Sequence, residues 1–312
     1  MSKVTKGIHH ITAIVSDPQE NMDFYAGILG LRFVKKTINF DDPGTYHFYF
    51  GDEDGSPGTI MTFFPVPGAH KGRVGSGQVG VTSFVVPAGS LSFWENRLAK
   101  FDIKTKKTNR FGENSLEFED IHGLRLELVE REEGALNNWS FGEVTPDVAI
   151  KGFGGATLYS RQPGKTAELL TSLMGLEKVG EEEDIIRLQA TGDIGNVIDI
   201  KQSAVVRGLQ GSGTVHHIAF RAEDDDDQIE WQHLLQENGY QVTPVQDRNY
   251  FNSVYFREFG QILFEIATDP PGFAIDEEKD RLGETLRLPE WYEPHRKRIE
   301  DILLPVEVRE LD

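Results

Sequence analysis

The feature that most constrains this chain is a pattern that recurs four times along its 312 residues. Each copy opens with a short run of β-branched and apolar residues, continues with a polar stretch of helical spacing, and ends with further strand-like runs. The four opening runs are GIHHITAIVSD, QVGVTSFVVPA, KGFGGATLYSRQ and TVHHIAFRAED. The pattern predicts an α+β fold built from four βαβββ modules, numbered one to four along the chain.

The polar stretch of each module predicts one helix. In module one, Met22, Tyr25 and Leu29 fall on one face of a helix because they are three and four residues apart. Glycines stand near the ends of three of these stretches, where helices commonly end. The four stretches are NMDFYAGILGL, SLSFWENRLAKF, KTAELLTSLMGL and QIEWQHLLQENGY.

A single βαβββ module is too small to bury the concave face of its own sheet. The modules are therefore expected to pair, forming two domains of cupped mixed sheets around shared cavities. Residues 134–151 have turn-forming residues and little periodicity, so they are predicted to link residues 1–133, with modules one and two, to residues 152–312, with modules three and four. The C-terminal tail is predicted to form a helix from about Pro289 to Leu304 that packs on module four.

The composition excludes several functions. The chain has 51 acidic and 32 basic residues, a formal net charge of −19, which disfavours binding to nucleic acids and to anionic membranes. No run of 18 apolar residues and no signal peptide is visible, so a cytoplasmic location is expected. The chain has no cysteine, and any metal must therefore be held by His, Asp or Glu.

Four of the nine histidines form two tandem pairs at equivalent places in modules one and four, at 9–10 and 216–217. Adjacent side chains of a strand point to opposite faces, so only one histidine of each pair is expected to face a cavity. His10 shares its face with Thr12, and His217 shares its face with Ala219 and Arg221. These small or polar neighbours favour His10 and His217 as the cavity residues.

Glu265 is a third candidate ligand, because it is an acid in an otherwise apolar final strand, where an unpaired carboxylate would be costly. Two imidazoles and one carboxylate form the facial triad that is typical of non-haem Fe(II) or Mn(II). Modules two and three have no histidine at the equivalent positions. A single site per chain therefore requires module one to pair with module four. The other histidines are assigned to loops or solvated faces: His47, His70, His122, His233 and His295. Of these, His47 could still line the cavity.

With these residues in view, the chain resembles the vicinal oxygen chelate superfamily of glyoxalases, bleomycin resistance proteins and extradiol dioxygenases. Within it, the chain is most similar to the ring-cleaving dioxygenases that act on hydroquinones. The similarity covers nearly the whole chain and is carried by HHIT, FYAGILGLRFVKKT, YHFYFGDEDGSPGTIMTFFP, VHHIAF, DRNYFNSVYFRE and FEIATDPPGF.

The resemblance implies a metal on His10, His217 and Glu265, the set already reached from the residues. The metal it implies is Fe(II), with Mn(II) as an alternative, and the partners are a small aromatic substrate and O2. Such an enzyme would serve the catabolism or detoxification of aromatic compounds. The resemblance also places five further residues near the substrate or around the metal: Tyr255, Arg248, His9, His216 and Thr12.

In such an enzyme, Tyr255 would act as an acid and Arg248 would stabilise negative charge on the phenolic oxygen. The alternation of side chains along a strand puts His9 and His216 on the opposite face, which predicts only indirect support from them.

Two other functions remain open on the same fold. A glyoxalase-like isomerase or lyase would use the metal as a Lewis acid, usually with four protein ligands. Module one ends in TIMTFFP, with Phe63 and Phe64 where a second carboxylate would stand, and this favours three ligands. A metal-free protein that binds aromatic ligands would have no need of the His/His/Glu set. The sequence leaves homo-oligomerisation open.

Overall fold

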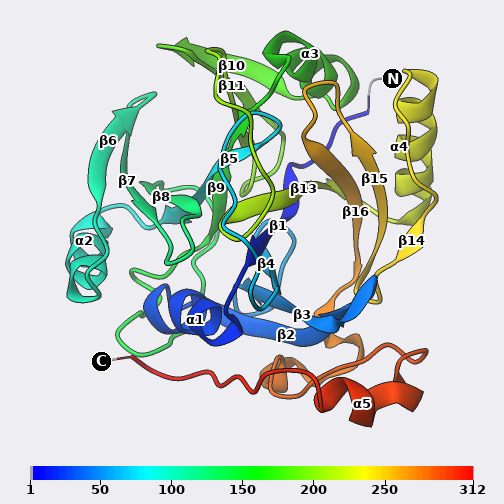
Figure 1. Cartoon of the computed structure of the whole chain (residues 1–312). Helices are drawn as coiled ribbons and strands as arrows, with labels where there is room; N and C mark the ends of the chain where they lie inside the picture. The colour runs from blue at the N-terminus through cyan, green and yellow to red at the C-terminus, as the bar shows by residue number, and fades with distance from the viewer. Residues whose placement is uncertain (1–2, 312) are drawn as a thin grey trace.

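Two eight-stranded mixed sheets, each curled into a half-barrel, make up most of the computed structural model, which describes residues 3–311 (Figure 1). The first sheet has the strand order β14 (Gln246–Asp247), β15 (Phe251–Arg257), β16 (Leu263–Pro271), β13 (Thr214–Ala222), β1 (Ile8–Val15), β4 (Ile60–Pro65), β3 (Asp42–Gly51) and β2 (Arg32–Asn39). The second has the order β10 (Glu177–Glu182), β11 (Ile185–Gln189), β12 (Val197–Lys201), β9 (Gly152–Tyr159), β5 (Gln78–Val86), β8 (Arg125–Glu130), β7 (Glu113–Glu119) and β6 (Lys106–Arg110).

Each half-barrel combines two modules through an antiparallel pair of opening strands. Strand β1 pairs with β13, so modules one and four share the first sheet. Strand β5 pairs with β9, so modules two and three share the second. The opening strands of all four modules are where the repeat predicts them, and the α+β fold is confirmed. Both sheets draw strands from each side of residues 134–151, and the division into domains at that segment stays a prediction.

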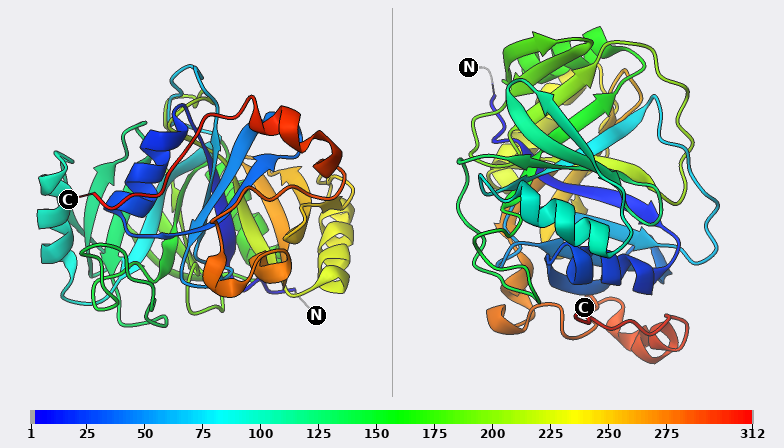
Figure 2. Two further views of the ribbon diagram at one scale, coloured as in Figure 1. Left: turned by 90° about the horizontal axis from the view of Figure 1, so that it is seen from below. Right: turned by 90° about the vertical axis from the view of Figure 1, so that its left-hand side faces the viewer.

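The four predicted helices are present and lie on the outer sides of the half-barrels (Figure 2). Two of them have an aspartate as N-cap. The side chain of Asp17 accepts hydrogen bonds from backbone N–H groups in the first turn of α1, and the side chain of Asp224 accepts one from the first turn of α4. Their bounds are α1 (Pro18–Met22) continued by the π-helical η1 (Asp23–Ile28), α2 (Leu91–Lys100), α3 (Pro163–Glu168) continued by η2 (Leu169–Leu173), and α4 (Asp225–Glu237). Trp94 of α2 and Trp231 of α4 are fully buried against their sheets. No helix within residues 3–311 is long and apolar enough to span a membrane.

The C-terminal tail differs from the prediction. Its helical parts are short: η3 (Phe273–Ile275), η4 (Lys279–Arg281), η5 (Glu293–His295) and α5 (Arg296–Glu300). The predicted helix from Pro289 to Leu304 is wrong because Pro294 cannot donate a backbone hydrogen bond inside a helix, and only one short helix follows it.

The tail also packs more widely than predicted. Its start contacts module four, where the hydroxyl of Tyr250 donates to Asp276 at 3.0 Å and Phe273 stacks on the ring of Tyr250, and the rest runs along module one. Figures 1 and 2 show it, in orange to red, running beside β2 and α1. The hydroxyl of Tyr46 in β3 donates to the carbonyl of Leu304 at 3.0 Å, and Arg309 pairs with Asp23 at 2.8 Å. The fully buried Lys35 of β2 lies 2.6 Å from each of two tail carboxylates, those of Asp276 and Glu277. The tail therefore covers the edge strand β2, whose backbone groups would otherwise be unpaired.

Candidate metal centre

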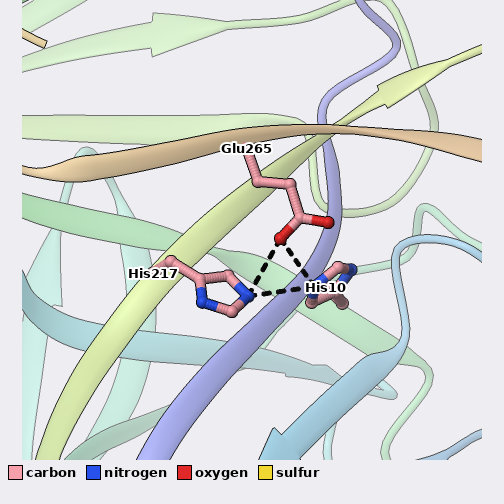
Figure 3. Close-up of side chains that lie close together, drawn as sticks. All are labelled: His10, His217 and Glu265. Carbon is pink, nitrogen blue, oxygen red and sulfur yellow. Dashed lines mark hydrogen bonds and ion pairs between the residues drawn. The ribbon is translucent and has the colours of Figure 1, made fainter. Parts of the chain in front are cut away.

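Three side chains from three neighbouring strands converge inside the first half-barrel (Figure 3). The Nε2 atoms of His10 in β1 and His217 in β13 are 3.2 Å apart. The Oε2 atom of Glu265 in β16 lies 3.3 Å from the former and 3.0 Å from the latter. All three residues are buried. The structure thus brings together the three ligands that the sequence predicts.

The triangle has the size that a metal ion requires. Three atoms bound at right angles by bonds of about 2.1 Å lie about 3.0 Å from one another. Within residues 3–311, the Oε2 atom of Glu265 accepts no hydrogen bond of good geometry, although it is buried. Its other oxygen accepts a hydrogen bond from Ser253 of β15, which fixes the carboxylate. A buried oxygen without a donor, facing two imidazole nitrogens, fits a bound cation.

Two β-bulges explain why the histidines occur in pairs. The pairing of β1 with β13 has one extra residue on each strand, His9 in β1 and His216 in β13. A bulge interrupts the alternation of side chains. The Nδ1 atom of His9 lies 2.9 Å from that of His10, and the Nδ1 atoms of His216 and His217 are 2.8 Å apart. The expectation that His9 and His216 point away from their partners is therefore wrong, and each touches the outer nitrogen of a triad histidine.

Burial and charge keep these groups in the forms that bind metal. Burial lowers the pKa of His9 and of His217, and it lowers the pKa of His216 to about 3. Burial alone would raise the pKa of Glu265, but His10 and His217 outweigh it and hold that pKa well below its usual range. At neutral pH a metal ion would therefore not have to displace a proton from His217 or Glu265.

A cavity of about 510 Å³ opens beside the triad. Its walls are largely aromatic, and His10 and His217 form part of its floor. The aromatic rings in the walls come from both modules: Phe40, Tyr49 and Phe64 from module one, and Phe251 and Tyr255 from module four. A cavity of this size and lining suits a small aromatic ligand.

Tyr255 and Arg248 lie on the module-four wall of this cavity. The Nε atom of Arg248 donates to the hydroxyl of Tyr255 at 3.2 Å, and the ring of Tyr255 lies 5.7 Å from that of His217. Burial and the charge of Glu265 raise the pKa of Tyr255, so its hydroxyl stays protonated at neutral pH. Arg248 is also held by Asp41 of module one at 3.0 Å.

The place of a fourth ligand is taken by a hydroxyl. In module four, Glu265 pairs across the sheet with Ala219, two residues after His217. In module one, Thr62 pairs in the same way with Thr12, two residues after His10. Thr62, and not Phe63 or Phe64, is therefore the counterpart of Glu265. Thr62 is fully buried, and its hydroxyl lies 2.7 Å from that of Thr12. As the sequence predicts, module one has no second carboxylate at this place, although the residue that stands there is Thr62.

Two of the remaining histidines are not solvated. His47 in β3 lines the cavity, where it is hydrogen-bonded to Thr62 and Tyr49. His122 is buried in a turn, 3.2 Å from the hydroxyl of Ser16. Only the alternation of TYHFYF in β3 could have indicated that His47 faces inward, because its partners lie on other strands. The exposed ones are those expected: His70, His233 and His295.

The second half-barrel shows what replaces the triad where histidines are absent. Its two carboxylates at the positions equivalent to Glu265 are Glu127 and Asp199. Arg110 pairs with Glu127 and Arg187 pairs with Asp199, each at 2.8 Å. The open volume among these ion pairs is only about 10 Å³. Arginine side chains thus neutralise and fill this site, whereas the site of the first half-barrel stays open.

Comparison with known proteins identifies the family. The model of the Glyoxalase/Bleomycin resistance protein/Dioxygenase superfamily matches residues 7–128 and 152–276. "Putative ring-cleaving dioxygenase MhqO" of Bacillus subtilis (strain 168) is 67% identical over 312 residues, which cover 100% of both chains. "Chlorohydroquinone/hydroquinone 1,2-dioxygenase" of Sphingobium indicum is 32% identical over 309 residues, covering 96% of this chain and 95% of the relative.

A solved structure agrees with this assignment. The crystal structure of a "putative dioxygenase" from Bacillus subtilis subsp. subtilis str. 168 superposes with a TM-score of 0.99 at 66% sequence identity, covering 99% of this chain and 100% of the other. The family model covers most of the chain, and the relatives match it almost from end to end. The chain therefore belongs to the glyoxalase/bleomycin resistance protein/dioxygenase superfamily.

Proposed function

We propose that this chain is a metal-dependent dioxygenase that opens a hydroquinone-type aromatic ring with O2. The observation that carries the proposal is a buried triad of two imidazoles and one carboxylate at the base of an aromatic cavity. Three protein ligands leave about three positions of an octahedral metal for other molecules. The names of the relatives, ring-cleaving and hydroquinone 1,2-dioxygenases, support the same reaction.

In this proposal His10, His217 and Glu265 hold Fe(II), with Mn(II) as the alternative. The chemistry that such a metal supplies is electron exchange between the ring and O2. The protein's own contribution is to hold the ring, to exclude water and to supply protons and charge. Asp41 holds Arg248 in place. The positive charge of Arg248 would stabilise the negative charge of a deprotonated phenolic oxygen. Tyr255 carries a proton at neutral pH and is aimed by Arg248, so it would serve as the acid.

The paired histidines would act through a fixed order of hydrogen bonds. His217 faces the metal position with Nε2, so its Nδ1 carries the hydrogen and donates to Nδ1 of His216. Neutral His216 then carries its own hydrogen on Nε2. His216 lines the cavity, and this N–H would be a donor to the substrate. The same reasoning applies to His9, but its remaining nitrogen bonds to the backbone of Thr268. His9 would therefore support His10 without touching substrate, whereas Thr12 would act on the module-one side, where its hydroxyl lies 2.7 Å from that of Thr62.

The proposal is tested by oxygen uptake after anaerobic loading of the protein with Fe(II). Methylhydroquinone, catechol and no substrate are offered in parallel, and uptake with methylhydroquinone that yields a ring-opened product is expected. His10→Ala is expected to lose both metal and uptake, whereas His233→Ala, at an exposed histidine of α4, keeps both. No uptake despite one bound metal per chain would contradict the proposal in favour of Lewis-acid isomerase or lyase chemistry. No bound metal would favour an aromatic-ligand-binding protein.

A further inference from the structure

A chain of four hydrogen-bonded groups crosses the module-one wall of the cavity. The hydroxyl of Tyr49 lies 2.8 Å from Nδ1 of His47, and Nε2 of His47 lies 2.9 Å from the hydroxyl of Thr62. The hydroxyl of Thr62 lies 2.7 Å from that of Thr12. Tyr49 and His47 line the cavity, whereas Thr12 and Thr62 are fully buried beneath it. None of these contacts is required to hold the triad.

The number of hydrogens in this chain determines what it can offer. Each hydroxyl carries one hydrogen, and a neutral imidazole carries one on nitrogen. Burial lowers the pKa of His47 well below its usual value, so the imidazole is neutral. The chain thus has four hydrogens and three internal hydrogen bonds. One hydrogen is left over, and it must leave the chain at Thr12, Thr62 or Tyr49.

Burial decides which group carries the unused hydrogen. Within residues 3–311 the hydroxyl of Thr12 contacts no hydrogen-bond partner other than Thr62, and that of Thr62 contacts only Thr12 and His47. Both threonines are fully buried, so a hydrogen that either of them did not donate within the chain would be buried without an acceptor, which is unfavourable. Thr12 therefore donates to Thr62, Thr62 donates to Nε2 of His47, and Nδ1 of His47 donates to the oxygen of Tyr49. The hydrogen of Tyr49 is left, on the wall of the cavity.

Tyr49 has a counterpart across the cavity. It pairs with Thr62 in the way that Tyr255 pairs with Glu265, so the two tyrosines occupy equivalent positions on opposite walls. The oxygen of each accepts a hydrogen bond from the protein, from His47 and from Arg248 respectively. Each O–H is consequently aimed at the ligand.

We propose that Tyr49, aimed by His47, is a substrate-binding donor that recognises a second oxygen of the ring, away from the oxygen held at the metal. The inference rests on the proposed function and deepens it. Two neighbouring oxygens, as in a catechol, can both reach one metal and need no donor on the far wall. An oxygen elsewhere on the ring needs a partner from the protein, and Tyr49 supplies it. The cavity therefore selects rings with two separated oxygens over monophenols.

The test compares binding of hydroquinone and phenol, which differ only in the second hydroxyl. Calorimetry is done without oxygen on Zn(II)-loaded protein, so that no turnover occurs. The wild type is expected to bind hydroquinone about tenfold more tightly than phenol, as one hydrogen bond provides. In Tyr49→Phe the ratio falls to about two, the statistical factor for a ring with two equivalent hydroxyls.

Three further variants separate this role from general damage to the wall. His47→Phe keeps a flat ring but cannot aim Tyr49, so its ratio also falls to about two. His47→Gln is expected to restore the preference, because an amide can accept from Thr62 and donate to Tyr49. Tyr46→Phe is the matched control, since Tyr46 lies in the same strand and donates to Leu304 outside the cavity.

A tenfold preference for hydroquinone over phenol that survives in Tyr49→Phe would overturn the inference, and so would a wild-type affinity ratio near two. The proposed function would remain intact in either case if methylhydroquinone still supports oxygen uptake. A wild type that binds neither ring would overturn both.

Discussion

Replacing Glu265 by Gln removes the negative charge of the triad while keeping the size of the side chain. In the metal-free protein this carboxylate is buried and its Oε2 atom has no donor of good geometry within residues 3–311. The change is expected to lower the stability of the metal-free protein at neutral pH, because His10 and His217 hold the pKa of Glu265 well below its usual range and so favour the ionised form. The stabilisation that a metal confers is expected to be lost.

The size of the effect follows from linkage. Metal at a hundred times its Kd stabilises the folded protein by about 2.7 kcal/mol. A chain of 312 residues unfolds with an entropy of about 0.7 kcal/mol per kelvin, so Tm rises by about 4 °C. Loss of a charge interaction of about 4 kcal/mol weakens binding about a thousandfold. At the same metal concentration the variant then gains less than about 0.1 kcal/mol, and its Tm does not change measurably.

The assay is thermal unfolding with and without Mn(II). Glu127→Gln is the matched control, because Glu127 is the equivalent residue of module two and pairs with Arg110. This control is expected to lower Tm in the metal-free protein, since it removes the negative charge that pairs with the partly buried Arg110, but to keep the metal-induced rise. A Glu265→Gln variant whose Tm rises as much as that of the wild type would refute the assignment of Glu265 as a ligand.

Three further changes test other parts of the structure. Tyr255→Phe should keep bound metal and lose about 10²- to 10⁴-fold in oxygen uptake; uptake at the wild-type rate would exclude Tyr255 as the acid. Glu277→Gln removes a partner of the buried Lys35 and should lower the free energy of unfolding by about 3 kcal/mol at pH 7 in urea titrations. Burial alone would raise the pKa of Glu277, but Lys35 outweighs it and holds this pKa below the unfolded value of about 4.3. The difference in the free energy of unfolding between wild type and variant should therefore vanish as pH falls through the folded pKa. A difference that is unchanged at low pH contradicts a stabilising Lys35–Glu277 pair. Gly80→Ala places a Cβ 2.4 Å from the ring of Tyr159 and should destabilise the protein by about 1–3 kcal/mol, whereas an unchanged Tm would show that this ring can move aside.

The sequence was sufficient to predict the fold because the pattern repeats. Each module carries its own strand and helix periodicities, and four copies agree with one another. The triad could be predicted for a related reason, since His10 and His217 occupy equivalent places in two copies and modules two and three supply the contrast. A single His in a strand would not have carried the same information.

The rest depends on contacts between distant segments. The roles of His9 and His216 depend on bulges, which are a property of how β1 pairs with β13 and not of either strand alone. His47 lines the cavity because of Tyr49 and Thr62 beside it, and neither neighbour makes it conspicuous in the sequence. Most of the tail packs on module one through single contacts spread along an irregular segment, which no periodicity encodes.

The proposed function requires that the triad at the base of the aromatic cavity opens a ring with both atoms of O2. The most direct measurement is mass spectrometry of the product formed from methylhydroquinone under ¹⁸O2 by the Fe(II)-loaded protein. The wild type is expected to form a ring-opened product that contains both labelled atoms, and His10→Ala is expected to form none of it. A product whose ring is intact, or a ring-opened product without label, would contradict the proposed function.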